Sequence, residues 1–217
     1  MNIESFFSLE NYKHALLFSN CEYPWIALLN LREYLKKYPL GKIESPLPSS
    51  VTLVHPELIS IGRNTLVDPG VHIIGPCIIG DDCQVRSGAY IRGGVVTGNH
   101  CVIGHATEIK ESILLDRASA PHFNYVGDSI LGNDVNLGAG LICANLRFDR
   151  ENVSVFFEGK KLTTPLKKLG ALVGDGSQLG CNCVLNPGTL ISKNVFCHPL
   201  LKISGYILPN SIIKTST

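Results

Sequence analysis

The chain has 217 residues, with 19 basic and 18 acidic side chains and a formal net charge of +1, so no charge imbalance attracts nucleic acid or an acidic membrane surface. Hydrophobic residues make up 45% of the sequence and the mean hydropathy is +0.18, which excludes a disordered chain. No apolar run reaches the roughly 18 residues of a membrane span, and MNIESFF has no signal-peptide form. We expect a cytoplasmic globular protein without nucleic-acid or membrane partners.

Eight cysteines raise the alternatives of disulfides and a metal site. No Cys-x-x-Cys pair is present, and the tightest spacing is Cys181-Asn182-Cys183. In a chain without an export signal, free thiols are the expected state. We therefore expect neither disulfides nor a structural metal.

The first fifty residues differ from the rest and predict a short helical cap. The stretches 8–18 and 23–38 carry apolar residues at helical spacing, with Ser8 as a candidate N-cap and Pro24 near the start of the second helix. Three prolines within 46–56 mark the passage into a different structure. We expect the cap to cover one open end of that structure.

A period of six residues dominates the middle of the chain. Its members are Ile61, Val67, Ile73, Ile79, Val85, Ile91, Thr97, Ile103, Ile109 and Leu115. Neither a helix nor an extended strand repeats at this spacing. Hexapeptide repeats do, because three short strands and three corners form one 18-residue coil of a parallel β-helix. The predicted fold class is therefore all-β, a parallel β-helix.

The position two residues before each member of this series holds mostly small side chains, as the crowded interior of a triangular prism requires. Its members are Thr65, Val71, Cys77, Cys83, Ala89, Val95, Cys101, Thr107, Ile113 and Ser119. The three cysteines of this set are predicted to be buried apolar groups. Gly62, Gly80 and Gly104 follow aliphatic members, which predicts corners with unusual backbone dihedrals.

The period resumes later, at Val173, Leu179, Leu185, Ile191, Cys197 and Ile203. Between the two runs the phase slips, because Leu131 lies 16 residues after Leu115 instead of 18, and we place the slip in 117–128. Residues 145–168 lack the repeat and predict a protruding, hairpin-like loop. The predicted organisation is a helical cap at 1–50, a β-helix at 51–206 with an inserted loop at 145–168, and a tail at 207–217. Such departures from a regular solenoid are where function is expected.

Arg92 and Lys110 are 18 residues apart, which is one full coil. This spacing predicts that the two cations stack at the same corner. Stacked like charges repel unless an anion lies between them, and a phosphate suits an Arg fork beside a Lys ammonium. The alternative is that both are ordinary solvated surface charges.

His122 lies in the expected phase slip, near Tyr125, with Asn136 and Asn145 further along the chain. A neutral imidazole outside the prism can act as a general base near neutral pH. Without further context, a hydrogen-bonded structural histidine is the preferred interpretation.

A metal site is less favoured by the sequence. His100 and His105 resemble part of the zinc site of the γ-type carbonic anhydrases, which are also β-helices. Such a site needs a third histidine two coils upstream, where this chain has Asn64. We expect both histidines to be surface corner residues.

Four stretches carry a resemblance to a known family: GAYIRGG (88–94), GHATEIKES (104–112), APHFNYVGDS (120–129) and ILGNDVNLGAGLICAN (130–145). In order, spacing and residue type they resemble the C-terminal acetyltransferase domain of the bifunctional N-acetylglucosamine-1-phosphate uridylyltransferase/glucosamine-1-phosphate acetyltransferases. They are more similar still to the β-helix tail of the archaeal-type sugar-1-phosphate nucleotidylyltransferases. The resemblance implies a left-handed β-helix that works as a homotrimer, with sites between neighbouring prisms.

The resemblance also implies roles for individual residues. His122 matches the general base that takes a proton from the sugar amine as the amine attacks the acetyl-CoA thioester. The implied substrate contacts are Arg92 and Lys110 for the sugar phosphate and Tyr125, Asn136 and Asn145 for the sugar. Cys181 stands where the bacterial enzymes have a serine near CoA. On charge alone, the lysines beside the inserted loop are candidates for the CoA phosphates: Lys160, Lys161, Lys167 and Lys168.

The sequence departs from the family in three places. The fifty residues before the repeat are too few for a nucleotidylyltransferase domain, so we expect no uridylyltransferase activity. Leu146 follows Asn145 where the bacterial enzymes have a tyrosine, which removes an aromatic sugar contact. Glu151 and Ser154 stand where the archaeal-type loop carries lysines, which removes cations near CoA or the phosphate.

The implied function is an acetyl-CoA-dependent N-acetyltransferase that acts on an amino-sugar 1-phosphate, with glucosamine 1-phosphate as the expected substrate. Its product would enter the synthesis of UDP-N-acetylglucosamine and cell-wall precursors. The residues leave glucosamine or galactosamine, and the acyl chain length, open. The alternative is a non-catalytic β-helix that binds a sugar phosphate or assembles with a separate nucleotidylyltransferase subunit.

Overall fold

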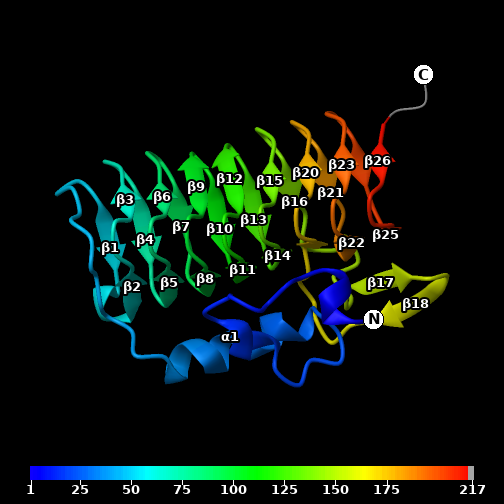
Figure 1. The fold of residues 1–217 in the computed structure, drawn as a ribbon, viewed down its shortest axis with the longest axis horizontal. Coiled ribbons are helices and arrows are strands. Elements are labelled where there is room, and N and C mark those ends of the chain that lie inside the picture. Colours follow the sequence, from blue (N-terminus) through cyan, green and yellow to red (C-terminus); the bar gives the residue numbers. More distant parts are fainter. Residues whose placement is uncertain (215–217) are drawn as a thin grey trace.

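The computed structural model describes residues 1–214, and most of them form a left-handed parallel β-helix with three flat faces (Figure 1). Each coil adds one strand to each of three sheets, and each sheet contains eight strands within the described residues. The predicted fold class is confirmed. We name the sheets after their first strands and the edges between them the β1–β2, β2–β3 and β3–β1 corners, in the order in which the chain passes them.

The strands are short, because each hexapeptide provides only two to four paired residues. The β1 sheet contains β1 (Thr52–Val54), β4 (His72–Ile74), β7 (Tyr90–Ile91), β10 (Glu108–Lys110), β13 (Tyr125–Gly127), β16 (Ile142–Cys143), β21 (Val184–Leu185) and β24 (Lys202–Ile203). The β2 sheet contains β2 (Ile59–Ile61), β5 (Cys77–Ile79), β8 (Val95–Thr97), β11 (Ser112–Leu114), β14 (Ile130–Leu131), β19 (Ala171–Val173), β22 (Thr189–Ile191) and β25 (Tyr206–Ile207). The β3 sheet contains β3 (Leu66–Val67), β6 (Gln84–Val85), β9 (Val102–His105), β12 (Ser119–His122), β15 (Asn136–Leu137), β20 (Gln178–Leu179), β23 (Phe196–Cys197) and β26 (Ile212–Ile213).

The six-residue period fills the prism as predicted, except that Leu115, and Ile113 two residues before it, face outward. Ile73, Ile91 and Ile109 are fully buried in one interior cluster, and Cys77, Cys83 and Cys101 lie in the same cluster as free thiols. The β-helix extends further than predicted, since β25 ends and β26 lies in the expected tail at 207–217. Residues 215–217 of that tail are outside the described residues.

The phase slip differs from the prediction in place and form. Two β1–β2 corners are each one residue short, so that Leu114 follows Ile109, and Leu131 follows Val126, at a spacing of five in the interior. Leu115 consequently faces outward and packs in a second apolar cluster. Corners tolerate this deletion because a residue lost within a strand would turn every later side chain to the wrong face.

The glycines that follow aliphatic residues allow close approach of neighbouring coils, contrary to the prediction of unusual dihedrals. Neither Gly80 nor Gly104 has a positive φ. A Cβ would lie 2.1 Å from a carbonyl oxygen of the next coil at Gly80, and 1.6 Å from one at Gly104. Left-handed conformations fall instead on residues such as Asn64 and Asp82 at the β2–β3 corner, which tolerate them better than most.

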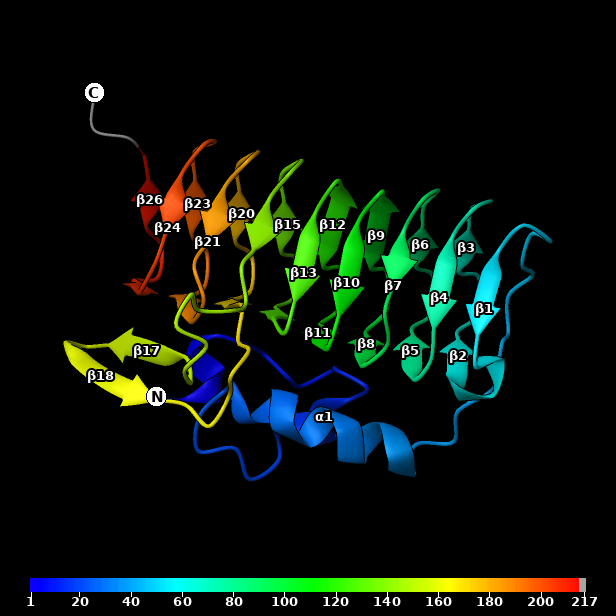
Figure 2. The ribbon, with the colours of Figure 1, turned by 180° about the vertical axis from the view of Figure 1, so that it is seen from behind.

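The N-terminal segment lies along one side of the β-helix, over the β2 sheet, and not over an end as predicted (Figures 1 and 2). Only the second predicted helix forms, as α1 (Ile26–Lys37). The stretch 8–18 folds into turns and the 3-10 helix η2 (Ala15–Phe18), and two further 3-10 helices are η1 (Ile3–Ser5) and η3 (Pro56–Leu58). The open end is instead packed by the passage into the first coil, including Ile43 and Leu47.

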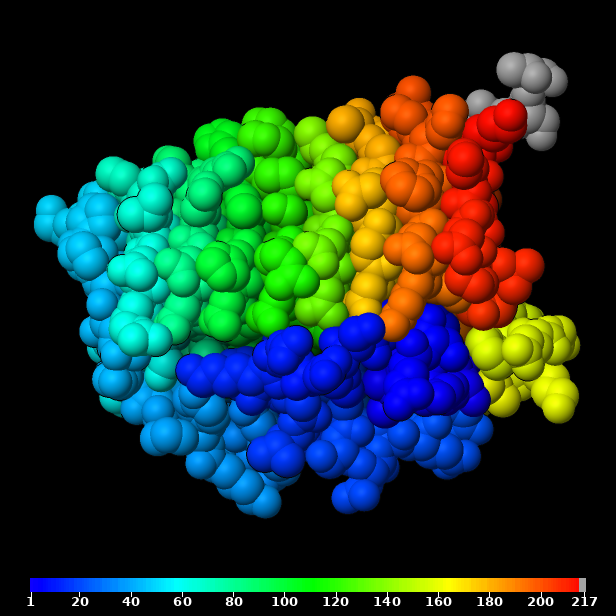
Figure 3. Space-filling view, viewed as in Figure 1, coloured from blue at the N-terminus to red at the C-terminus, as the bar shows by residue number. Residues whose placement is uncertain are grey.

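Apolar side chains on the outer face of the β2 sheet explain this position. These outward residues are Ile78, Val96, Ile113, Ile130, Leu172 and Leu190, and they are buried against Phe6, Phe7, Trp25, Leu28, Leu31 and Leu35. Each large side chain buried in this way contributes about 1.5–3 kcal/mol. The β2 sheet therefore has a core on both faces, and the space-filling view shows the N-terminal segment seated against the β-helix (Figure 3).

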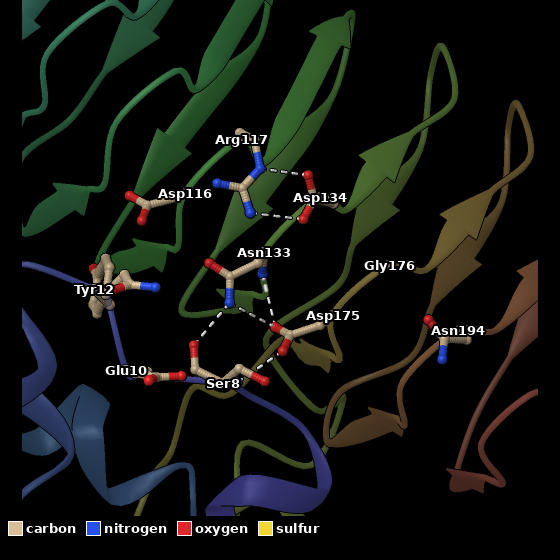
Figure 4. A pocket seen from close by; sticks show the side chains of 11 residues that line it. Ser8, Glu10, Tyr12, Asp116, Arg117, Asn133, Asp134, Asp175, Gly176 and Asn194 are labelled. Atoms are coloured by element: carbon tan, nitrogen blue, oxygen red, sulfur yellow. Dashed lines mark hydrogen bonds and ion pairs between the residues drawn. The ribbon is translucent and has the colours of Figure 1, made fainter.

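Polar contacts fix the first residues to the β2–β3 corner beside a cleft of about 360 Å³ (Figure 4). The Ser8 amide donates to Asp175 Oδ2 at 2.7 Å, and Asn133 Nδ2 donates to the Ser8 carbonyl at 2.9 Å. Lys193 Nζ donates to Ser8 Oγ at 2.8 Å. Ser8 is thus an anchor to the β-helix and not a helix N-cap.

The insertion between β16 and β19 contains an antiparallel hairpin of β17 (Ser154–Phe157) and β18 (Lys160–Thr163). Val153 and Val155 are buried in the cluster formed by the N-terminal segment. The rings of Phe157 and Tyr206 lie 4.6 Å apart. The hairpin therefore packs beside the N-terminus (Figures 1 and 2). No helix within residues 1–214 is both long and apolar enough to span a membrane.

His14 is a buried histidine of the N-terminal segment. Its Nδ1 lies 2.7 Å from Tyr34 Oη, and the rings of Tyr12 and Tyr38 pack edge-on against it. Burial, followed by the nearby charge of Lys13, lowers the pKa of His14 to about 4. The ordinary value applies in the unfolded chain, so the neutral form favours the folded state. This stabilisation is complete above about pH 6.5 and is lost as the pH falls toward 4.

We predict that the wild-type protein loses about 2 kcal/mol more stability between pH 7.5 and pH 5 than the His14→Gln variant. Urea unfolding followed by circular dichroism at both pH values measures this difference. His55→Gln, at an exposed position, is the matched control and should lose as much as the wild type. Equal losses in the wild type and His14→Gln would contradict the assignment.

Candidate active site

Three of the predicted site residues lie at the β1–β2 corner, and the hydroxyl of a fourth, Tyr125, reaches it from the start of its strand. Arg92 follows β7, Lys110 ends β10, Tyr125 begins β13 and Asn145 opens the insertion after β16. β7 and β10 pair with Ile91 opposite Ile109. Arg92 and Lys110 therefore occupy equivalent positions in neighbouring coils, as their spacing predicts.

Each of these cations already has a carboxylate partner, so the predicted need for an anion between them is wrong. Arg92 Nη1 lies 2.6 Å from Glu108 Oε1, and Lys110 Nζ lies 2.6 Å from Asp128 Oδ2. The hydrogen bond from Arg92 to Glu108 raises the pKa of the Arg92 guanidinium. Like-charge repulsion at this corner is thus relieved by the chain itself.

The two ion pairs differ in burial. The side chains of Lys110 and Asp128 are 11% and 14% exposed, whereas those of Arg92 and Glu108 are 43% and 34% exposed. Exposed pairs contribute about 0–1 kcal/mol and exchange partners readily. A buried pair is held firmly, because separating it leaves an unpaired charge away from water.

Asp128 joins the buried pair to two further predicted residues. Asn145 Nδ2 lies 2.5 Å from Asp128 Oδ2 and 3.2 Å from Tyr125 Oη. Gly127 makes room for them, since a Cβ there would lie 2.7 Å from both Asn145 Nδ2 and Tyr125 Oη. We call Lys110, Tyr125, Asp128 and Asn145 the Lys110 cluster.

His122 lies at the other edge of the β1 sheet. It ends β12 at the β3–β1 corner, three residues before the start of β13. Its main chain is fixed by the Asn124 side chain at 3.1 Å and by the Gly140 amide at 3.0 Å. The imidazole is exposed and makes no hydrogen bond within residues 1–214. The interpretation as a hydrogen-bonded structural histidine is therefore not supported.

Cys181 lies at the same corner as His122, two coils further along the axis. The Asn182 amide donates to the Ala139 carbonyl at 2.8 Å, and the Gly140 amide donates to the His122 carbonyl at 3.0 Å. Two coils correspond to about 9–10 Å. The Cys181 side chain is exposed, and it therefore shares an accessible edge with His122.

The remaining predicted residues are dispersed. Asn136 belongs to the β3 sheet, where it pairs with Ser119 and Gln178, and it lies apart from the Lys110 cluster. Lys167 and Lys168 are exposed at the end of the insertion. The Leu169 amide donates to the Asn145 carbonyl at 3.0 Å, so the chain returns both lysines close to the main chain of Asn145.

No three His, Cys, Asp or Glu side chains gather to hold a metal ion in the part of the chain that the structure describes. His100 and His105 are exposed corner residues, as predicted. The cleft of Figure 4 contains none of the predicted site residues, and its contacts serve the attachment of the N-terminal segment.

Sequence reasoning missed the two carboxylates of this site. Asp128 follows Lys110 by 18 residues, and Glu108 follows Arg92 by 16. A search for opposite charges at a spacing of about one coil would have found both. Asp128 was also present in the stretch APHFNYVGDS that carries the family resemblance.

Comparison with known proteins finds relatives of this chain among proteins described as bifunctional. The family model described as "GMPPB C-terminal domain" matches residues 73–169. A bifunctional sugar-1-phosphate nucleotidylyltransferase/acetyltransferase from Sulfurisphaera tokodaii is 35% identical over 151 residues, which is 61% of this chain and 38% of the relative. A bifunctional protein GlmU from Methanococcus vannielii is 36% identical over 177 residues, 79% of this chain and 40% of the relative.

The predicted resemblance is confirmed. This chain is a homologue of the C-terminal β-helix part of these bifunctional proteins, and it spans about two fifths of their length. Solved structures with a related shape include a perosamine N-acetyltransferase from Caulobacter crescentus in complex with CoA and GDP-perosamine, with a TM-score of 0.40, 15% identity and coverage of 80% of this chain and 60% of that one. Another is a UDP-N-acetylglucosamine acyltransferase from Campylobacter jejuni, with a TM-score of 0.43, 12% identity and coverage of 77% and 69%.

We predict that Lys110→Met lowers the free energy of unfolding by about 1.5–3 kcal/mol, because Asp128 Oδ2 loses its charged partner and keeps only the amide of Asn145. The double substitution Lys110→Met/Asp128→Asn should recover most of this loss. Arg92→Met, which breaks the exposed pair, should cost about 1 kcal/mol or less. Urea unfolding of the three variants measures these free energies. Equal losses in Lys110→Met and Arg92→Met would contradict the prediction that the buried pair stabilises the fold more than the exposed pair.

Proposed function

We propose that this protein is an acetyl-CoA-dependent N-acetyltransferase of an amino-sugar 1-phosphate, with glucosamine 1-phosphate as its substrate. The observation that carries the proposal is the pairing of two features on the same coils. An exposed imidazole without a hydrogen-bond partner in residues 1–214, His122, lies at one edge of the β1 sheet, and the Lys110 cluster lies at the other. The homology to bifunctional nucleotidylyltransferase/acetyltransferases supports a sugar phosphate as the substrate class.

In the proposed reaction, His122 is the general base. It accepts a proton from the sugar amine as the nitrogen attacks the thioester carbonyl. A C–N bond forms, the C–S bond of acetyl-CoA breaks, and the proton passes from His122 to the departing CoA thiolate. The products are the N-acetylated sugar phosphate and CoA.

Substrate contacts are assigned to the β1–β2 corner. Arg92 exchanges its exposed partner Glu108 for the sugar phosphate, and the ammonium of Lys110 adds a second positive charge. Tyr125 and Asn145 contact the sugar, and Asn136 contacts it from the β3 sheet.

Acetyl-CoA is assigned to the later coils. Cys181 lies beside it on the edge that also carries His122, and Lys167 and Lys168 meet its phosphates. These lysines make no ion pair within residues 1–214, so they are available to an anion.

A homotrimer is the proposed working form. The β2 sheet is covered by the chain's own N-terminal segment, whereas the β3 sheet leaves Leu66, Phe196 and Ile212 exposed at 66%, 49% and 66%. A neighbouring chain packed on the β1 and β3 sheets would cover these side chains and enclose both edges of the β1 sheet. The 217 residues contain no glycine-rich nucleotide loop, so we expect no uridylyltransferase activity from this chain by itself.

Release of CoA thiol from acetyl-CoA tests the proposed reaction. Glucosamine 1-phosphate, galactosamine 1-phosphate and free glucosamine are compared as acceptors. We expect turnover that requires the 1-phosphate. Absence of turnover with all three acceptors, from folded protein, would favour a β-helix that only binds sugar phosphate or assembles with another subunit.

The His122→Ala variant tests the general base. Loss of proton transfer should lower kcat by about 10²–10⁴-fold. His105→Ala is the control, because His105 pairs with His122 in the neighbouring strand and is also exposed, although its Nδ1 lies 2.8 Å from the Ser87 carbonyl oxygen; it should retain wild-type kcat. Wild-type kcat in His122→Ala, at unchanged oligomeric state, would exclude the assignment.

A further inference from the structure

The Asp128 carboxylate has one committed oxygen and one free oxygen. Oδ2 accepts from Lys110 Nζ at 2.6 Å and from Asn145 Nδ2 at 2.5 Å. Oδ1 has no hydrogen-bond partner within residues 1–214. The fully buried polar side-chain atoms that lack a partner in this part of the chain are Ser60 Oγ, His72 Nε2 and Ser192 Oγ, so Asp128 Oδ1 reaches the surface.

The contacts of Oδ2 hold Asp128 in one orientation. The carboxylate is fixed by a charge-assisted hydrogen bond and an amide from a different coil, and its main chain adopts φ 49°. The Asp128 amide donates to the Lys110 carbonyl at 3.0 Å, and the Gly170 amide donates to the Asp128 carbonyl at 2.8 Å. Oδ1 therefore faces the surface as a preorganised acceptor that loses little entropy when a ligand binds.

The charge of Asp128 selects which part of a sugar phosphate it meets. A carboxylate repels a phosphate and accepts hydrogen bonds from hydroxyl groups, which a sugar ring offers at several carbons. The phosphate has a better partner in Arg92, whose side chain already reaches the next coil to pair with Glu108. The exposed pair of Arg92 with Glu108 is weaker than the buried pair of Lys110 with Asp128. The phosphate therefore displaces Glu108 from Arg92 more easily than it displaces Asp128 from Lys110.

We propose that Asp128 is a specificity-determining residue whose Oδ1 accepts a hydrogen bond from a ring hydroxyl of the sugar. The inference rests on the proposed function for its substrate class. It adds a residue to the site and divides the corner into a phosphate part at Arg92 and a sugar-reading part at Asp128. Sites that hydrogen-bond a hydroxyl discriminate strongly against analogues that lack it, because the polar group of the protein is left unpaired.

Calorimetric binding of glucosamine 1-phosphate and its 3-, 4- and 6-deoxy analogues tests this inference. We expect the wild type to bind at least one analogue about 10- to 100-fold more weakly than the parent sugar phosphate, as for a hydrogen bond to a charged group. Asp128→Asn should bind the parent more weakly and lose its preference over that analogue. A merely structural role would weaken the parent and the analogue equally and keep the preference.

Asp134→Asn is the matched control. Asp134 has φ 58° and pairs with Arg117 of the preceding coil, like Asp128 with Lys110, but it lies at the β2–β3 corner. It should bind all four ligands as the wild type does. If Asp128→Asn does not fold, the double variant Lys110→Met/Asp128→Asn removes both charges together and should show the same loss of preference.

The outcomes separate this inference from the proposed function. The role of Asp128 is overturned if the wild type binds every deoxy analogue with the same affinity as the parent sugar phosphate, or if it binds none of the four ligands. It is also overturned if Asp128→Asn keeps the full preference for the parent. Parallel thiol-release measurements decide the reaction. Selective binding without turnover supports the role of Asp128 and contradicts the proposed acetyl transfer. Turnover together with undiminished selectivity in Asp128→Asn supports the acetyl transfer and contradicts the role of Asp128.

Discussion

The in-register stacking of coils is the constraint on which the rest of this molecule depends. Because every strand pairs with its counterpart one coil away, residues 17 or 18 apart become neighbours about 4.8 Å from one another. In the interior, identical aliphatic side chains of neighbouring coils pack favourably on one another. Like charges stacked in the same way repel, so Arg92 and Lys110 at equivalent positions are each paired with a carboxylate from a neighbouring coil.

The three corners have different roles because a different part of the chain contacts or leaves the β-helix at each of them. The β2–β3 corner anchors the first residues through Asn133 and Asp175. Both one-residue deletions and the insertion after β16 occur at the β1–β2 corner. The start of the insertion places Asn145 against the ion pair of Lys110 with Asp128. At the β3–β1 corner, the imidazole of His122 has no hydrogen-bond partner among residues 1–214. The proposed site residues thus lie mainly at the two edges of the β1 sheet, while the β2 sheet is covered by the chain's own N-terminal segment.

Much of the fold and part of the site could be predicted, because the six-residue period is set by local geometry. The period identified the interior side chains and the stacking of Arg92 on Lys110. The position of the N-terminal segment depends on a non-local fact, the apolar outer face of the β2 sheet. The sequence does carry a signal for this apolar outer face. The strands Cys77-Ile78-Ile79 and Val95-Val96-Thr97 have no polar residue at their outward position, as is typical of strands covered on both faces. The slip was misplaced because Leu115 keeps the period while facing outward.

The carboxylates escaped prediction for a related reason, and their presence changes how the site works. A cation paired in advance is not a free phosphate ligand, because binding must replace a carboxylate before it gains anything. The exposed pair of Arg92 with Glu108 makes this exchange easy, while the buried pair of Lys110 with Asp128 resists it. The corner is therefore close to neutral without substrate, which limits nonspecific binding of anions. In the proposed binding mode, a ligand gains most affinity there when it brings both a phosphate for Arg92 and a hydroxyl donor for the fixed carboxylate of Asp128.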